Sequence, residues 1–382
     1  MWPNLPSLRV MAVWAAAGAV VIVSGALLVA WSGVINTTAS SGHWRVTEWF
    51  LELAMRSSVA THSLRVGEAP RLDDPDLIRL GAGHFAGSCA PCHGAPGQPR
   101  GPMFLRMLPQ PTDLVEAGPT WKPHQLFWIV KHGIKYSGMP AWVALERDDE
   151  VWSVVAFLNA LPSLGPEQYR ALALGNVDQR QQSAADLVRS GPSATSLAAC
   201  GRCHEDERTP STSRLVPNLS GQHRGYLERA LLEYARGERQ SGVMQPVAAD
   251  LEFSETAALA DFYSSLPART ANAEGDPAEI ALGRGIATEG LPEKSIPACL
   301  ACHGKGTALI PRLSGQRAPF LRAQLQLWAK GGRVRSVAGR IMAPIALRLS
   351  REQIDAVSAF FESHELQDHD PAGSLGRAEP QR

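Results

Sequence analysis

The sequence is poor in cysteine, with six in 382 residues, and it has no net charge, because 37 basic residues balance 37 acidic ones. So few cysteines exclude a scaffold built on disulfides, and any role for them must lie in their spacing. The charge balance gives the whole chain no attraction to nucleic acid, so no nucleic-acid partner is expected. The 45% of hydrophobic residues excludes a chain that is disordered throughout.

Charge is also absent from one long stretch, since no Asp, Glu, Lys or Arg occurs between Arg9 and Arg45. Residues 10–35 within it are almost wholly apolar. A membrane-crossing helix needs about 20 such residues, whereas the apolar part of a cleavable signal has about 7 to 15. Trp31 suits an interfacial anchor. We therefore expect residues 1–36 to form a transmembrane anchor with a short cytoplasmic N-terminus.

The next segment, residues 37–72, is a linker in which apolar side chains recur at roughly helical intervals, among them Trp44, Trp49 and Phe50. This pattern fits a helix that lies on the membrane surface, and it fits equally a helix packed on the first soluble domain. The sequence alone favours neither interpretation.

All six cysteines fall in three copies of one motif, C-x-x-C-H, which is the attachment signature of c-type haem. The motif occurs at Cys89, Cys92 and His93, at Cys200, Cys203 and His204, and at Cys299, Cys302 and His303. In such a motif the two thiols bond to the porphyrin and the adjacent imidazole ligates the iron. The sequence therefore predicts three covalently bound haem c groups.

Two other uses of paired cysteines explain the pattern less well. A thioredoxin-like redox motif has no need of the histidine. A zinc site pairs two C-x-x-C units, but these three are odd in number and lie 111 and 99 residues apart. Haem attachment in bacteria takes place on the outer side of the inner membrane, so we expect a single-pass inner-membrane protein whose haem domains lie in the periplasm.

The sixth iron ligands are sought among the methionines, because His/Met ligation raises the reduction potential. Only Met244 lies between the second and third motifs, and only Met342 follows the third. In the first domain Met139 lies 46 residues after its motif histidine, against 40 and 39 for the other two pairs. Each of the three is followed closely by proline, which suggests a stiffened loop. Met103 and Met107 are assigned to core packing. The rival ligands are histidines: His84, His124, His132 and His223.

The last two haem regions are copies of each other, because a run that includes Pro217, Gly221 and Gln222 recurs 94 positions later as Pro311, Gly315 and Gln316. Helical periodicity follows in both, no convincing strand occurs, and an all-α fold is expected. Asp74 before Pro75 should cap the first helix of the first domain, and Asp148 or Asp149 the closing one. The predicted haem domains cover residues 73–170, 183–270 and 278–366, with polar boundaries near 171–183 and 271–277 and a mobile tail over 367–382.

Each of these regions resembles a class I cytochrome c, in which a helix, the C-x-x-C-H motif, a middle helix, a methionine loop and a closing helix follow in order. Domains two and three, with their shared Pro-x-Leu-Ser-Gly-Gln run, resemble the tandem dihaem cytochromes of the c-four type. Domain one, through residues 128–134 leading into Gly138, Met139 and Pro140, resembles single-haem domains of membrane-bound bacterial cytochromes. Glu205 stands where a glycine follows the motif in the other two domains.

The resemblance implies a membrane-anchored carrier that transfers electrons within a bacterial respiratory chain, toward a terminal oxidase or another acceptor. Expected partners are redox proteins: an oxidase, a cytochrome bc complex or dehydrogenase subunits. An alternative is the cytochrome subunit of a membrane-bound dehydrogenase complex. A true enzyme with an open haem would need a missing axial methionine. Because His and Met saturate each iron, no small-molecule substrate and no catalytic residue is expected.

The zero net charge conceals an asymmetry between the domains. Residues 278–350 contain 11 basic and three acidic residues, whereas the other two haem domains are slightly acidic. This imbalance suggests that domain three presents a cationic face, with Arg333 and Arg335, to an acidic redox partner. The alternative is that the basic domain clamps onto its own acidic neighbours.

Overall fold

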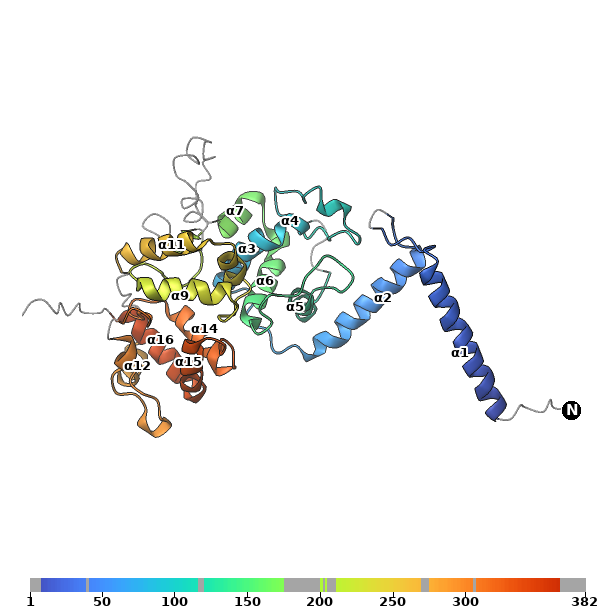
Figure 1. Ribbon diagram of the computed structural model, residues 1–382. Coiled ribbons are helices and arrows are strands. Elements are labelled where there is room, and N and C mark those ends of the chain that lie inside the picture. The colour runs from blue at the N-terminus through green and yellow to red at the C-terminus, as the bar shows by residue number, and fades with distance from the viewer. Residues whose placement is uncertain are drawn as a thin grey trace, which may run out of the picture.

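The computed structural model describes residues 8–38, 41–115, 120–174, 200–201, 203–204, 211–268, 275–304 and 307–364. In these ranges every regular element is a helix, and β-pairing is limited to two isolated bridges, which confirms the expected all-α fold (Figure 1). The predicted boundaries near 171–183 and 271–277 lie partly outside the described residues, and the predicted tail and Glu205 lie wholly outside them.

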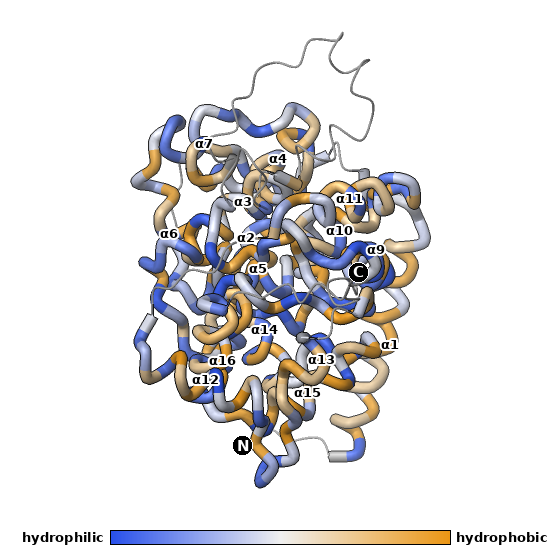
Figure 2. The backbone as a smooth tube through the Cα atoms, turned by 90° about the vertical axis from the view of Figure 1, so that its left-hand side faces the viewer, coloured by the Kyte–Doolittle hydropathy of each residue, from blue (hydrophilic) through white to orange (hydrophobic). Residues whose placement is uncertain are grey.

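The apolar segment near the N-terminus is the helix α1 (Leu8–Trp31), which projects away from the helical body (Figure 1). Its segment Arg9–Trp31 is hydrophobic (Figure 2), with a mean hydropathy of 2.3, and none of the residues in its apolar window is buried. By length and composition this helix can cross a bilayer, and an N-terminal signal sequence has the same features.

The linker contains the helix α2 (Arg45–His62), followed by the 3-10 turn η1 (Ser63–Arg65). Its N-terminal half exposes Trp49 and Phe50 to solvent. Its C-terminal end packs on the body, where Val59 is buried and the ring of His62 stacks on Trp128, with ring centroids 5.2 Å apart. The C-terminal end of α2 thus packs on the first soluble domain, as one interpretation expects, and contact of the N-terminal half with a membrane surface stays a prediction.

The first helical group comprises α3 (Pro75–Ser88), α4 (Ala90–His93), α5 (Pro123–His132), α6 (Asp148–Ala160) and α7 (Pro166–Leu174), with the turns η2 (Phe104–Arg106) and η3 (Leu161–Ser163). Its core contains the fully buried side chains of Phe85, Phe157 and Tyr169. Asp74 caps α3 as expected, since its carboxylate accepts from the Asp76 N–H at 2.9 Å. The expected cap on α6 is wrong: the helix begins at Asp148, and the residue before it makes no side-chain cap.

Two further groups follow, each with a buried cluster of its own. The second contains α9 (Arg224–Ala235), α10 (Met244–Ala249) and α11 (Phe253–Ser265). The third contains α12 (Pro277–Glu289), the turn η4 (Pro292–Lys294), α13 (Leu300–His303), α14 (Ala318–Ala329), α15 (Val337–Arg348) and α16 (Arg351–Ser363). The second and third groups lie on the far side of the first group from α1 (Figure 1).

The first and third groups share one feature of packing, a crossing of their first and closing helices at a glycine. A Cβ atom on Gly81 of α3 would lie 2.0 Å from the carbonyl oxygen of Ser153 in α6. A Cβ atom on Gly283 of α12 would lie 2.0 Å from the carbonyl oxygen of Ala356 in α16. Backbone therefore touches backbone at both crossings, and only glycine fits there. This contact fixes the helix pair against which each haem motif is placed.

We expect the substitution Gly283→Ala to lower the free energy of unfolding by about 1–3 kcal/mol, because the added methyl must push α12 and α16 apart. Gly285→Ala on the same helix is the matched control, since a Cβ atom there meets nothing within 4 Å. The control should be neutral or stabilising by about 0.4–1 kcal/mol, because alanine restricts the unfolded chain. Denaturant unfolding of both variants measures the difference, and equal effects would contradict the close crossing.

Candidate haem sites

The three C-x-x-C-H motifs adopt the same backbone turn. In the first, the carbonyl oxygen of Cys89 accepts from the N–H of Cys92 at 3.1 Å and from that of His93 at 2.9 Å. The corresponding distances are 3.1 and 2.9 Å in the motif of Cys200, and 3.3 and 3.0 Å in that of Cys299. One helical turn therefore brings both thiols and the imidazole to the same place in all three copies.

Each motif histidine is oriented by a hydrogen bond from its Nδ1 to a backbone carbonyl. His93 Nδ1 lies 2.8 Å from the oxygen of Thr112, His204 Nδ1 lies 3.0 Å from that of Pro217, and His303 Nδ1 lies 2.9 Å from that of Pro311. A carbonyl oxygen can only accept, so Nδ1 must carry the hydrogen in each ring. This tautomer leaves Nε2 with a free lone pair, which is the form of histidine that binds a metal.

Burial supports the same protonation state in the second and third motifs. It lowers the pKa of His204 and of His303, although the hydrogen bond to the proline carbonyl opposes this shift in both. A lowered pKa keeps the imidazole neutral at physiological pH. These two rings are therefore ready to ligate a metal without first losing a proton.

The leading cysteine of each motif is partly buried and packs against the core of its own group. Burial raises the pKa of Cys89 to about 12 and the pKa values of Cys200 and Cys299 to about 11. Redox-active C-x-x-C motifs have lowered pKa values instead, so this environment disfavours the thioredoxin-like alternative. Across the described ranges no three His, Cys, Asp or Glu side chains gather as a metal site of their own.

The three predicted methionine ligands are all half-buried, but only one lies in a loop. Met139 is in the loop between α5 and α6, where its N–H donates to Ser137 Oγ at 3.2 Å. Met244 is the first residue of α10, and Met342 lies inside α15, which also contains Pro344. The expectation of a proline-stiffened loop is therefore wrong for these two.

The other two methionines of the first group differ from each other. Met103 is 72% exposed, so its assignment to core packing is wrong. Met107 packs against the next loop, since a Cβ atom on Gly138 would lie 1.8 Å from the Met107 methyl carbon.

The rival histidines are held by contacts of other kinds. The ring of His84 packs on Trp142, with centroids 4.5 Å apart, and that of His132 packs on Trp128 at 3.9 Å. The ring of His124 meets the edge of Trp152 at 5.6 Å. His223 precedes α9 as its cap residue. These contacts support the methionines as sixth ligands, which remain a prediction.

Two buried arginines at matching positions of the repeat lack a carboxylate partner in the part of the chain that the structure describes. Arg239 lies over the ring of Tyr234 at 4.6 Å, and Arg333 lies over that of Trp328 at 4.3 Å. The Nε atoms of both arginines, and the indole N–H of Trp328, are buried without a hydrogen-bond partner. Burial, together with Arg239 nearby, also lowers the pKa of Arg333. These donors fit a buried anion such as a haem propionate.

A buried carboxylate from the first group holds the loop that leads into Met244. Glu150 of α6 accepts from Ser241 Oγ and from the Gly242 N–H, both at 2.6 Å, and it pairs with Arg147 at 2.8 Å. Ser241 Oγ in turn accepts from the Met244 N–H at 3.0 Å. Burial raises the pKa of Glu150, and the guanidinium of Arg147 opposes this shift. The loop that leads into Met244 is thus held by the Arg147–Glu150 pair of the first group.

Several basic residues of the third group are buried or paired within the chain, whereas a cationic docking face would expose them. Arg333 is buried, with 6% of its surface exposed, and Arg335 pairs with Glu146 of the first group at 2.9 Å. Arg317 is also buried and donates to the carbonyl of Ser213 in the second group at 2.9 Å. The intramolecular clamp is therefore the better account of these residues, and Arg333 is not available to a partner.

Sequence reasoning missed Glu150, Ser241 and the contacts of Gln222 and Gln316 described below. The glutamines could have been singled out from the sequence, because they are identical polar residues at matching positions of the repeat. Glu150 could not, since an acidic residue in the first turn of a helix is ordinary.

Comparison with known proteins finds one matching family and several cytochrome relatives. Residues 76–158 match the family described as cytochrome c oxidase, cbb3-type, subunit III. A thiosulfate dehydrogenase electron acceptor of Stutzerimonas stutzeri is 33% identical over 189 residues, covering 47% of this chain and 87% of that protein. Cytochrome c4 of Pseudomonas aeruginosa is 30% identical over 171 residues, covering 43% of this chain and 83% of that protein.

Solved structures give a similar result over a similar length. The structure of reduced recombinant cytochrome c4 from Pseudomonas stutzeri is 27% identical, covers 45% of this chain and 97% of that chain, and has a TM-score of 0.41. That of Acidithiobacillus ferrooxidans cytochrome c4 is 31% identical, covers 43% of this chain and 98% of that chain, and has a TM-score of 0.40.

We expect Glu150→Ala to lower the free energy of unfolding by about 3–5 kcal/mol, because it leaves Arg147 buried beside fewer negative charges. Glu146→Ala is the matched control, since its carboxylate pairs with Arg335 while 41% of the side chain is exposed. The control should cost less than about 1 kcal/mol. Denaturant unfolding of the two variants measures both values. Similar small losses would show that Glu150 does not stabilise the contact between the first two groups.

Proposed function

The chain belongs to the c-type cytochromes, with domains like those of the cytochrome c4 group, and from this premise we propose that it is a membrane-anchored trihaem electron carrier. Its activity is electron transfer, and it is not an enzyme in its own right. We place the protein at the periplasmic face of a bacterial inner membrane, where it would serve a respiratory chain.

The observation that carries the proposal is the threefold recurrence of one arrangement. In each copy two cysteines and a histidine share a helical turn, and the histidine Nδ1 is bonded to a backbone carbonyl. Bound haem supplies an iron that takes up and releases one electron. The cysteines would hold it covalently, and His93, His204 and His303 would offer Nε2 to it. The three separate buried clusters support a division into three haem domains, as the sequence predicts.

Met139, Met244 and Met342 are the proposed sixth ligands, with the effect of raising the potential. Their spacing from the motifs, their half-burial and the ring contacts of the rival histidines support this assignment. Arg239 and Arg333 are the proposed partners of haem propionates, because each has a buried donor that no described side chain satisfies. With histidine and methionine as its two protein ligands, the iron would leave no position for a small-molecule substrate.

The membrane side of the proposal depends on α1 and α2. The apolar α1 is the proposed anchor, and the exposed Trp49 and Phe50 of α2 suit the membrane surface beside it. The other end of α2 packs on the first group, so this group is the part of the haem-binding body nearest the anchor (Figure 1). Electrons would thus pass between the second and third groups and a membrane-bound partner by way of the first.

A second candidate function is that of electron acceptor for a thiosulfate dehydrogenase. Relatives from Stutzerimonas stutzeri and Thiomonas intermedia bear that name, and each is 33% identical over most of its own length. The matched length of 189 residues is about that of two of the proposed haem domains. Under this proposal the second and third groups would accept the electrons, and the first would pass them on.

Spectroelectrochemical titration of the matured protein tests the carrier. Three haems per chain, three one-electron waves and a Met–iron charge-transfer band are expected, with no binding of an external ligand such as cyanide at low concentration. Met244→Ala should remove part of that band, lower the potential of one wave and open one haem to ligand. A ligand-binding haem in the unaltered protein would contradict the saturated axial positions and favour an enzyme.

Stopped-flow mixing with a thiosulfate dehydrogenase and thiosulfate tests the second candidate. Rapid reduction of the haems is expected, with a rate that falls as ionic strength rises if charge steers the encounter. Horse-heart cytochrome c in place of this chain is the control for non-specific acceptance. If the haems of this chain are reduced no faster than the control, the second candidate is wrong, and the chain would be a carrier for another electron donor.

A further inference from the structure

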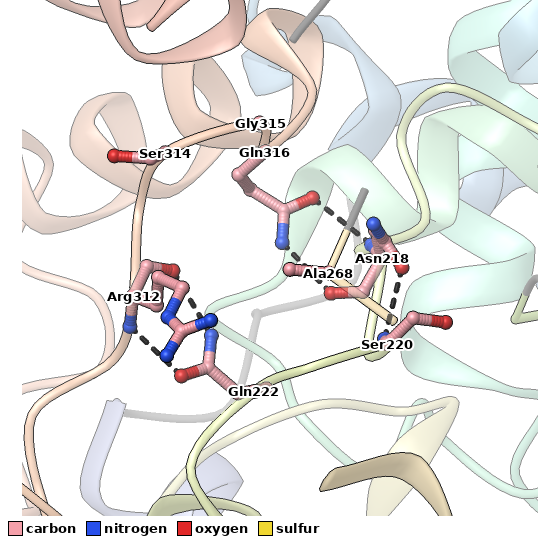
Figure 3. Close-up of a pocket in the computed structure, with 8 residues that line it drawn as sticks. All are labelled: Asn218, Ser220, Gln222, Ala268, Arg312, Ser314, Gly315 and Gln316. Atoms are coloured by element: carbon pink, nitrogen blue, oxygen red, sulfur yellow. Dashed lines mark hydrogen bonds between the residues drawn. The ribbon is translucent and has the colours of Figure 1, made fainter. Parts of the chain in front are cut away.

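A reciprocal pair of glutamines joins the second and third groups (Figure 3). Gln316 accepts from the N–H of Asn218 at 2.9 Å through Oε1 and donates through Nε2 to the Asn218 carbonyl at 2.9 Å. Gln222 accepts from the N–H of Arg312 at 2.8 Å and donates to the Arg312 carbonyl at 2.9 Å. Each glutamine thus holds one residue of the other group by both of its backbone polar groups, as in a two-fold interface.

Asn218 and Arg312, the two residues held by the glutamines, each come directly after the proline whose carbonyl orients a motif histidine. Pro217 O accepts from His204, and the N–H of the same peptide group, on Asn218, donates to Gln316. Likewise Pro311 O accepts from His303, and the N–H on Arg312 donates to Gln222. A single peptide group therefore connects each motif histidine to a side chain of the other group.

The glutamines are themselves fixed in place. Both are buried, with 7% of each residue exposed, and the Oε1 of each also accepts from the N–H of the residue that follows it. The residue before each is a glycine at positive φ, +68° at Gly221 and +72° at Gly315, where a side chain would be strained. A Cβ atom on Gly221 would also lie 2.6 Å from Ala268. This turn aims the amide at the other group.

We propose that Gln316 and Gln222 are positioning residues that tune each other's haem: Gln316 of the third group tunes the haem held by His204, and Gln222 of the second tunes the haem held by His303. The inference rests on the proposed function. Donation of a peptide N–H to glutamine polarises the peptide and makes its carbonyl a stronger acceptor. A stronger acceptor increases the basicity of the imidazole, which stabilises the oxidised iron and lowers the potential.

The first group holds the corresponding carbonyl segment with a residue of its own. Arg100 Nη1 donates to Pro111 O at 2.8 Å, beside the Thr112 carbonyl that orients His93, and Arg100 also pairs with Asp113 at 3.4 Å. Arg100 belongs to the same group as His93. The first haem therefore serves as an internal reference in the full chain.

The test is spectroelectrochemical titration of the matured full-length protein in three forms: unaltered, Gln316→Leu and Gln222→Leu. Variants of Met244 and Met342 first assign the waves of the second and third haems. Gln316→Leu should raise the potential of the second haem alone, and Gln222→Leu that of the third alone. Gln316→Asn, whose shorter amide does not reach Asn218, should act in the same direction and keeps the position polar if the leucine variant does not mature.

Arg214→Ala is the matched control, because Arg214 pairs with Glu362 across the same interface at 2.8 Å without touching either peptide. It should move neither wave selectively. If Gln316→Leu moves the wave of the third haem, or moves both waves as Arg214→Ala does, the glutamine acts only by holding the interface and the inference is overturned. Unmoved waves overturn it as well. Failure of the unaltered chain to show three His/Met haems would instead overturn the proposed function.

Discussion

The hydrogen bond from a motif histidine to a backbone carbonyl is the interaction on which the rest of the structure depends. It fixes the tautomer of the ring, so it decides which nitrogen is offered to a metal. It also requires the fold to hold a distant carbonyl in place. The accepting carbonyl lies 19, 13 and 8 residues after His93, His204 and His303, in segments that are neither helix nor strand. Irregular backbone of this kind keeps its position only if something else holds it.

The three groups hold these carbonyl segments in two ways. The first uses Arg100 from its own motif loop, whereas the second and third use a glutamine from each other. The same division appears in the charges. Arg147 is compensated by Asp149 and Glu150 of its own group, but among the described residues neither Arg239 nor Arg333 forms an ion pair with a carboxylate. A haem propionate at these two arginines would supply the missing charge, so haem would be part of what makes the junction stable.

Much of this arrangement could be predicted from the sequence. The helical fold follows from periodicity, the cap on α3 from Asp74 and Pro75, and the three motif turns from the cysteine spacing. Contacts between groups could not be predicted, since they depend on how the groups dock. The basic character of residues 278–350 was clear, for example, but not that Arg333 is buried or that Arg335 pairs with Glu146. The same limit applies to Met342, whose helix accommodates a proline that sequence rules place in a loop.

The reciprocal glutamines also bear on how such a protein can change over evolutionary time. A group that holds its own histidine carbonyl keeps that hydrogen bond when a neighbouring group is lost or exchanged. The second and third groups cannot be separated in this way, because each would lose the side chain that holds its accepting peptide. They should be inherited as a pair, and the relatives that match this chain over about the length of two such groups are of the size expected for that pair.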